Sequence, residues 1–180
     1  MHLQISVSIL APMHELDEAW SQMLAAAMAN AKSSGRGDVA EYLALKQSND
    51  LVRQTGVDWL FQAFIEIASE ANRQNPHIII EREEPHEFEF ERAIMAGSLI
   101  RVRSGVRSLM VEAGWTRIPA HGFMRGGALA AARIRHFGRP KAGIDLMLVK
   151  NEDAPAWRSA TGENLDSKYL REHFEIFLED

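Results

Sequence analysis

Three polar residues near the middle of the chain have the types needed for acid–base chemistry. Glu112 lies at the end of a predicted strand, and Arg117 and His121 follow it in the loop 113–126. A carboxylate that orients an imidazole for proton exchange is a common catalytic arrangement, and such residues often lie on loops. Glu112 and His121 are therefore the candidate catalytic residues. Ordinary salt bridges also occupy such positions, which is the alternative interpretation.

The same loop continues into a candidate anion-binding site. Residues 127–137 are rich in alanine, carry basic residues toward their end and are followed by a glycine and a proline, which predicts a short helix. Arg125, Gly126 and Gly127 would lie at its N-terminus, where backbone N–H groups and the helix dipole favour a negative charge. We therefore expect an anionic small molecule to bind the loop 113–127. The expected ligand-binding residues are Trp115, Arg117, His121, Arg125, Gly126 and Gly127.

Other interpretations of this loop stay open. It matches neither of the common glycine-rich phosphate signatures, G-x-x-x-x-G-K-[ST] and G-x-G-x-x-G. The glycines could serve turns, Trp115 and Phe123 could belong to the core, and the arginines could pair with glutamates. No metal or cofactor is expected, since the chain has no cysteine and the helical pair His14 and Glu18 lacks an evident third ligand.

Charge is distributed unevenly along the chain. The net charge is −5, but residues 96–141 contain nine basic residues and one acid, which is +8 and leaves −13 for the remainder. Acidic and basic strands that face each other would neutralise this asymmetry. A basic surface would instead suit a nucleic-acid-associated protein that uses the arginine-rich segment 99–141, which is one alternative function. An oligomeric interaction module with no ligand, held by arginine–glutamate contacts, is another.

The hydrophobic pattern predicts an α+β fold. Apolar residues recur at helical spacing over about 13–32, 38–54 and 57–74, which predicts three N-terminal helices packed on a sheet. The period then changes to two, which predicts a mainly antiparallel sheet with a hairpin at Ser104–Gly105. The short helix would follow the glycine-rich loop, and a C-terminal helix is expected after Asp166.

The length and composition favour one ordinary globular domain. At 180 residues the chain is expected to form a single domain, 1–180, with a helical half of about 1–75 and a sheet-containing half of about 76–180. The first ten residues contain no lysine or arginine, which does not favour a secretory signal. No run approaches the roughly 18 apolar residues of a membrane helix. We expect a soluble cytoplasmic protein, with no membrane partner, that could form a homo-oligomer.

Overall fold

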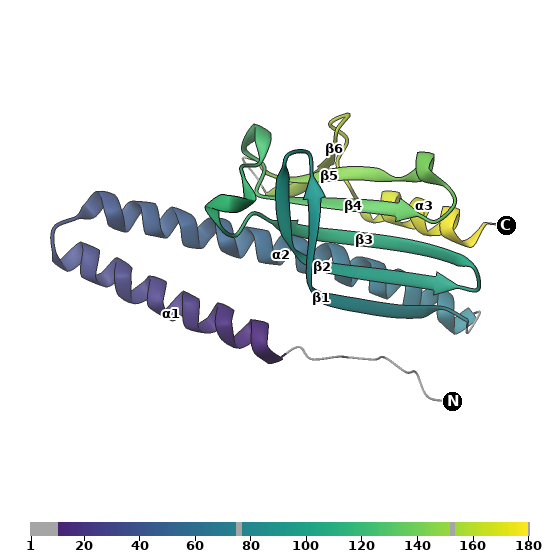
Figure 1. Ribbon diagram of the computed structural model, residues 1–180, viewed down its shortest axis with the longest axis horizontal. Helices are drawn as coiled ribbons and strands as arrows, with labels where there is room; N and C mark the ends of the chain where they lie inside the picture. The colour runs from purple at the N-terminus through teal and green to yellow at the C-terminus, as the bar shows by residue number, and fades with distance from the viewer. Residues whose placement is uncertain (1–10, 75–76, 152–153, 180) are drawn as a thin grey trace. The chain divides into compact units, whose positions relative to one another are not determined.

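The computed structural model describes residues 11–74, 77–151 and 154–179, and Figure 1 shows how their helices and strands are arranged. These residues form three α-helices and one six-stranded sheet, so the predicted α+β class is confirmed. The helices are α1 (Ala11–Ser33), α2 (Gly37–Gln74) and α3 (Ser167–Leu178). The strands are β1 (Ile79–Phe90), β2 (Ala93–Ser104), β3 (Arg107–Trp115), β4 (Ala130–His136), β5 (Ile144–Lys150) and β6 (Pro155–Ser159).

The chain divides within α2 into two compact units. Ser6–Val52 form one unit, a hairpin of α1 and the first part of α2, and Arg53–Asp180 make up the main part of the other. The second unit contains the sheet, the end of α2, and α3. The organisation as one domain stays a prediction, and the boundary expected at about residues 75–76, between the helical half and the sheet-containing half, lies outside the described residues.

The prediction of three N-terminal helices is wrong, because the second and third form the single helix α2. The predicted helices 38–54 and 57–74 would be separated at Thr55–Gly56, where α2 is continuous. A Cβ on Gly56 would lie 2.6 Å from Leu148 Cδ2, and Trp157 Nε1 donates a hydrogen bond to the Gly56 carbonyl at 2.9 Å. The glycine therefore allows α2 to pack closely on the sheet. This packing offsets the roughly 1 kcal/mol that glycine costs inside a helix.

The predicted short helix after the glycine-rich loop is also wrong. Residues Ala130–His136 form β4, which pairs with β3 on one side and with β5 on the other. Ala130, Ala131 and Ala132 are fully buried although their side chains alternate between the two faces of the strand. Both faces are therefore covered. The helix preference of alanine is weak, and here tertiary packing overrides it.

The predicted C-terminal helix and the antiparallel sheet are confirmed. The Asp166 side chain accepts a hydrogen bond from the Tyr169 backbone N–H at 2.8 Å, which caps the first turn of α3. Leu170, Phe174 and Phe177 are buried along one side of this helix. The six strands follow one another in sequence order, and each pairs antiparallel with the next.

Helices cover one face of the sheet, and the end of a hairpin covers part of the other. α3 lies behind the sheet in Figure 1, together with the part of α2 that follows Arg53. The β1–β2 hairpin has a bulge between Glu83 and His86, and its far end bends across the front. There it encloses a second small core of Phe88, Phe90, Ala93, Met95 and Ala131, against which Met124 and Met147 pack. The main core, between the sheet and the helices, and this small core bury β4 from both sides.

Gly97 and Gly114 are paired on β2 and β3, next to this bend, and they provide a test of the packing. A Cβ on Gly97 would overlap the carbonyl oxygen of Ala113. We expect Gly97→Ala to lower the free energy of unfolding by about 1–3 kcal/mol, measured by urea denaturation. Gly37→Ala is the control, because a Cβ there meets no atom within 4 Å. Equal stability of the two variants would contradict a close approach of the strands at this pair.

Candidate functional site

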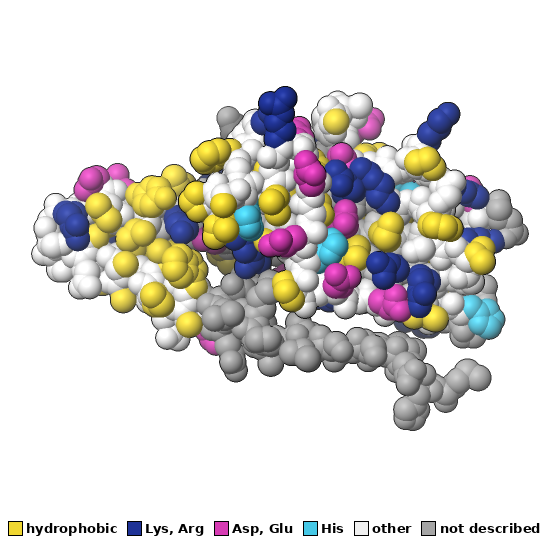
Figure 2. Space-filling view, in the orientation of Figure 1, with side chains coloured by type: hydrophobic (Ala, Val, Ile, Leu, Met, Phe, Trp, Pro, Cys, Tyr) yellow, Lys and Arg dark blue, Asp and Glu magenta, His cyan; other side chains and the backbone are white. Residues whose placement is uncertain are grey.

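The face of the sheet turned away from the helices carries paired charges rather than a continuous basic surface. Four arginines pair with two carboxylates: Arg133 and Arg135 with Asp145 at 3.1 and 2.7 Å, and Arg101 and Arg103 with Glu81 at 3.8 and 2.8 Å. Basic and acidic side chains are interleaved on this face in Figure 2. The acidic start of β1 therefore neutralises part of the basic segment, as expected for facing strands.

Three of the predicted ligand-binding residues lie together at the start of the loop. The Arg117 guanidinium carbon is 4.5 Å from the centre of the Trp115 ring, which is a cation–π contact. The His121 imidazole accepts a hydrogen bond from the Arg117 backbone N–H through Nδ1 at 3.3 Å. These contacts lie within the loop and hold its own conformation.

The other predicted residues, Arg125, Gly126 and Gly127, form a single 3₁₀ turn. Because β4 follows, they do not begin an α-helix, and the helix dipole on which the predicted anion site depended is missing. Arg125 Nε lies 3.9 Å from the Glu91 carboxylate, and both side chains are largely exposed. Gly126 and Gly127 have φ angles of 64° and 70°, which residues with a side chain rarely adopt. The two glycines therefore allow the chain to turn here.

The candidate catalytic residues Glu112 and His121 are not joined by a hydrogen bond or ion pair in the described part of the chain. Glu112 instead accepts from His86 Nε2 at 2.9 Å, and the other ring nitrogen of His86 lies 3.4 Å from Glu83. The bulge in β1 sets the position of His86 opposite Gly97. No local pattern in the sequence would have indicated this pairing, because it depends on the register of three strands.

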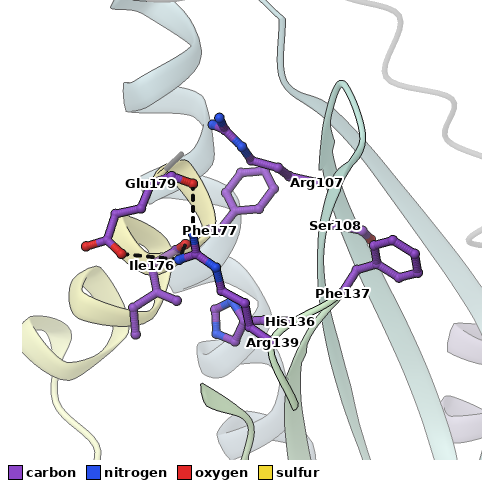
Figure 3. A pocket seen from close by; sticks show the side chains of 8 residues that line it. All are labelled: Arg107, Ser108, His136, Phe137, Arg139, Ile176, Phe177 and Glu179. Carbon is purple, nitrogen blue, oxygen red and sulfur yellow. Dashed lines mark hydrogen bonds and ion pairs between the residues drawn. The ribbon is translucent and has the colours of Figure 1, made fainter. Parts of the chain in front are cut away.

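A cavity of about 200 Å³ lies where the start of β3, the end of β4 and the end of α3 meet, and we call it the α3 cavity. Figure 3 shows the side chains that line it. They are Arg107, Ser108, His136, Phe137, Arg139, Ile176, Phe177 and Glu179. The cavity thus combines two guanidinium groups, a hydroxyl and an imidazole with an apolar wall. None of these residues belongs to the predicted binding set.

Both arginines of the α3 cavity contact the last turn of α3. Arg107 Nη1 donates to the Leu178 carbonyl at 2.6 Å, and Arg139 Nη1 donates to the Ile176 carbonyl at 2.9 Å. Arg139 also pairs with the Glu179 carboxylate at 3.2 Å and bonds the Glu179 carbonyl at 3.3 Å. Cations at a helix C-terminus satisfy its free carbonyl groups and interact favourably with its dipole. These contacts therefore fix both the end of α3 and the positions of the guanidinium groups.

A pair of histidines lies beneath the cavity. His136 of β4 and His173 of α3 are only 5% and 6% exposed, and their rings stack with Nε2 of His136 3.0 Å from Nδ1 of His173. Burial, and then the positive charge of Arg139, lower the pKa of His136. Burial, and then the neighbouring His136, lower the pKa of His173 to about 4. Both rings are therefore neutral near pH 7, and one N–H joins them.

Two buried polar atoms of the cavity residues have no hydrogen-bond partner among the described residues, namely Ser108 Oγ and His136 Nδ1. Buried polar atoms are nearly always hydrogen bonded, because leaving one unpaired costs about 1–3 kcal/mol. If His173 donates the shared proton, His136 Nδ1 carries its own proton and can donate to an acceptor. His136 and the two arginines then contribute donors to the lining of the α3 cavity, which also contains the Glu179 carboxylate. This set of donors suits an anion.

Sequence analysis missed this cavity because its residues come from three distant segments. They are Arg107–Ser108, His136–Arg139 and Ile176–Glu179. In the sequence, the arginines were only part of the basic segment and His136 was assigned to the last turn of a helix. The spacing within each segment carries no signature of a ligand site. Tertiary packing alone brings them together.

The described residues contain no group of three or more His, Cys, Asp or Glu side chains placed to hold a metal ion. No helix in the described part of the chain combines the length and the apolar character needed to cross a membrane. Comparison of the chain with models of protein families, with curated proteins and with solved structures found no match. The geometry of the α3 cavity is therefore the main basis for a functional proposal.

The histidine pair predicts that stability falls in mild acid. The pKa of His173 is 6.5 in the unfolded reference and about 4 in the folded chain, so between these values the unfolded state binds more protons. The contribution of His173 is therefore complete above about pH 6.5 and is lost as the pH falls toward 4, by at most about 3 kcal/mol. Urea denaturation between about pH 7 and pH 4.5 measures this loss.

The matched variants for this prediction are His173→Asn and His77→Asn. His77 is exposed, so its replacement should leave the pH dependence unchanged. His173→Asn should remove about one proton from the difference in bound protons between the unfolded and folded states. The free energy of unfolding should then change less steeply with pH. A slope that persists in His173→Asn would assign the acid sensitivity to other groups, among them His136, whose pKa is also lowered by burial.

Proposed function

We propose that this protein binds a small anionic molecule in the α3 cavity. The observation that carries the proposal is a cavity lined by two arginines and by His136, whose buried Nδ1 has no hydrogen-bond partner among the described residues. An anionic oxygen would accept a hydrogen bond from His136, provided that the ring carries its proton on Nδ1. Guanidinium groups add charge-assisted hydrogen bonds, which are stronger than neutral ones.

The size and lining of the cavity restrict the ligand. About 200 Å³ is smaller than the roughly 300–1,000 Å³ of pockets for drug-sized molecules, so the ligand is small. Phe137, Ile176 and Phe177 supply apolar surface, and Figure 3 shows them interspersed with the polar side chains of the lining. An anionic head with a short apolar body fits this combination.

The loop 113–127 gives less support to the same function. Its proposed anion site needed the N-terminus of a helix, and the chain forms a turn and a strand there. Arg117 stacks on Trp115, and Arg125 lies near Glu91. Binding of nucleic acid through the segment 99–141 also has less support, because phosphate contacts need a continuous basic surface and the arginines of the sheet face are paired with carboxylates.

A second candidate function, protein association, rests on the unit Ser6–Val52. Buried residues of this helical hairpin include Leu24, Ala31 and Ala40. Five large apolar side chains are 47–66% exposed: Trp20, Met23, Tyr42, Leu45 and Leu51. Exposed apolar groups that gather on one helical hairpin are typical of interaction sites.

If the hairpin mediates self-association, sedimentation velocity should show an oligomer. Leu45→Glu should dissociate this oligomer, and the neighbouring Gln47→Glu should not. A monomer at all concentrations would contradict this candidate.

Calorimetric titration and thermal shift test the anion site directly. The probes are hexanoate, benzoate and inorganic phosphate, with hexanamide as the neutral match for hexanoate. A bound anion at about 100 times its dissociation constant should add roughly 2.7 kcal/mol to stability. For a chain of this size that is a rise in melting temperature of roughly 5–10 °C. Hexanamide should produce no shift.

Three variants locate the binding. Ser108→Ala removes a cavity hydroxyl without touching α3 and should weaken binding roughly 2- to 13-fold, the loss of one hydrogen bond of about 0.5–1.5 kcal/mol. Arg139→Lys keeps the charge but removes the planar donor pair and should weaken binding further. Arg125→Ala should leave binding unchanged. Binding that is lost in Arg125→Ala and kept in the other two variants would place the anion on the loop instead.

A further inference from the structure

In the described part of the hairpin Ser6–Val52, α1 exposes surface that its packing on α2 does not cover. Residues 19–31 of α1 contain no acidic or basic side chain. Within this stretch Leu24 and Ala31 are buried, Met28 is half-buried, and the other residues are exposed. A helix that is largely apolar on all sides is normally a buried helix. The hairpin by itself therefore leaves α1 incompletely packed.

One face of the hairpin gathers aromatic and apolar side chains. On α1, the exposed residues Trp20, Met23 and Ala27 are three and four positions apart, so they share one side of the helix. On α2, the exposed Tyr42 lies four positions before Lys46, whose ammonium nitrogen is 4.8 Å from the centre of the Trp20 ring. This contact places both stripes on the same side of the hairpin. We call these five residues the hairpin face, and Figure 2 shows hydrophobic side chains gathered over the hairpin.

We propose that the hairpin face binds the same face of a second copy of the chain, so that two hairpins form a four-helix bundle. This inference rests on the second candidate function, protein association, and specifies its partner and its surface. A helix buries its apolar stripe against another element, and two helices alone form a single layer. Four helices enclose a shared core. Two-fold dimers are also the commonest assemblies of identical chains.

The charges of the hairpin face suit a second copy. Lys46 is its one charged residue, and its ammonium group is already held over the Trp20 ring within the hairpin. An identical face therefore brings no carboxylate that would be buried without a partner. A strongly charged partner would find few opposite charges here to match its own. Trp, Tyr and Met are in addition side chains that are enriched in protein interfaces.

The size of the hairpin also meets the needs of a dimer. α1 contains 23 residues, and the part of α2 within this unit, residues 37–52, contains 16. At 1.5 Å per residue and about 10 Å of width for each helix, one face of the hairpin covers roughly 600 Å². Two copies would then bury about 1,200 Å², the lower limit of the roughly 1,200–2,000 Å² of specific, stable interfaces. The face is thus large enough to hold two copies together.

The first test is sedimentation velocity over a range of protein concentrations, which should show a dimer. Met23→Glu should weaken the association roughly 100-fold or more, because each dimer would bury two unpaired carboxylates at its centre. The control is Ala25→Glu, which adds the same charge at an exposed position roughly 160° around α1 from Met23. It should leave the dimer intact. Circular dichroism should show the same helix content in both variants.

The second test uses the absence of cysteine from the chain. In Ala27→Cys, the introduced thiol on the hairpin face should react with Ellman's reagent more slowly as the concentration rises, in proportion to the remaining monomer. In Ala25→Cys, the thiol on the other side of α1 should react at the same rate at every concentration. This comparison locates the contact independently of any loss of association.

The remaining outcomes overturn separate steps. A dimer that Leu45→Glu dissociates and Met23→Glu does not would overturn the hairpin face, while protein association would stand. A monomer at all concentrations would overturn the second copy as partner. In that monomer, slow reaction of Ala27→Cys would mean that another part of the same chain covers the face. Fast reaction would mean that the face is open to a different molecule.

Discussion

Strand β4 is the constraint on which the rest of the sheet-containing unit depends. It lies in the middle of the six-stranded order and is covered on both faces, by helices on one side and by the bent end of the β1–β2 hairpin on the other. Its three alanines allow both layers to approach the sheet closely. The same strand ends in His136, so the position of the α3 cavity follows from where β4 stops. A helix at this place would have removed the second small core and the cavity together.

The basic segment of the chain is used mainly to join elements. Arginines of β2 and β4 pair with carboxylates of β1 and β5 across the open face of the sheet, and Arg107 and Arg139 hold the last carbonyl groups of α3. Guanidinium suits both uses because it is planar and always charged. The α3 cavity differs from the sheet face in one respect. Its arginines stand beside buried polar atoms that no described residue satisfies.

The stability of the fold and the chemistry of the cavity meet in the histidine pair. His136 and His173 join β4 to α3 in a buried contact that requires neutral rings, and α3 supplies one wall of the cavity. A ligand that accepts a proton from His136 Nδ1 would reinforce the tautomer in which His173 donates between the rings. On the proposed function, ligand binding and the docking of α3 would be coupled through one shared proton.

The amino-acid sequence by itself determined the α+β class, the antiparallel sheet and the C-terminal helix capped by Asp166. These features follow from local periodicity and capping chemistry. The sequence left open whether the basic segment pairs with acidic strands or forms a basic surface. Tertiary structure alone decided the continuity of α2 through Gly56, the strand at Ala130–His136, and the partner of Glu112. In each case long-range packing outweighed a local preference: Leu148 against Gly56, burial of the alanines on both faces, and a bulge that sets His86 beside Glu112. Tertiary structure alone also decided the α3 cavity, because the packing of its three distant segments leaves no pattern in the sequence of any one segment.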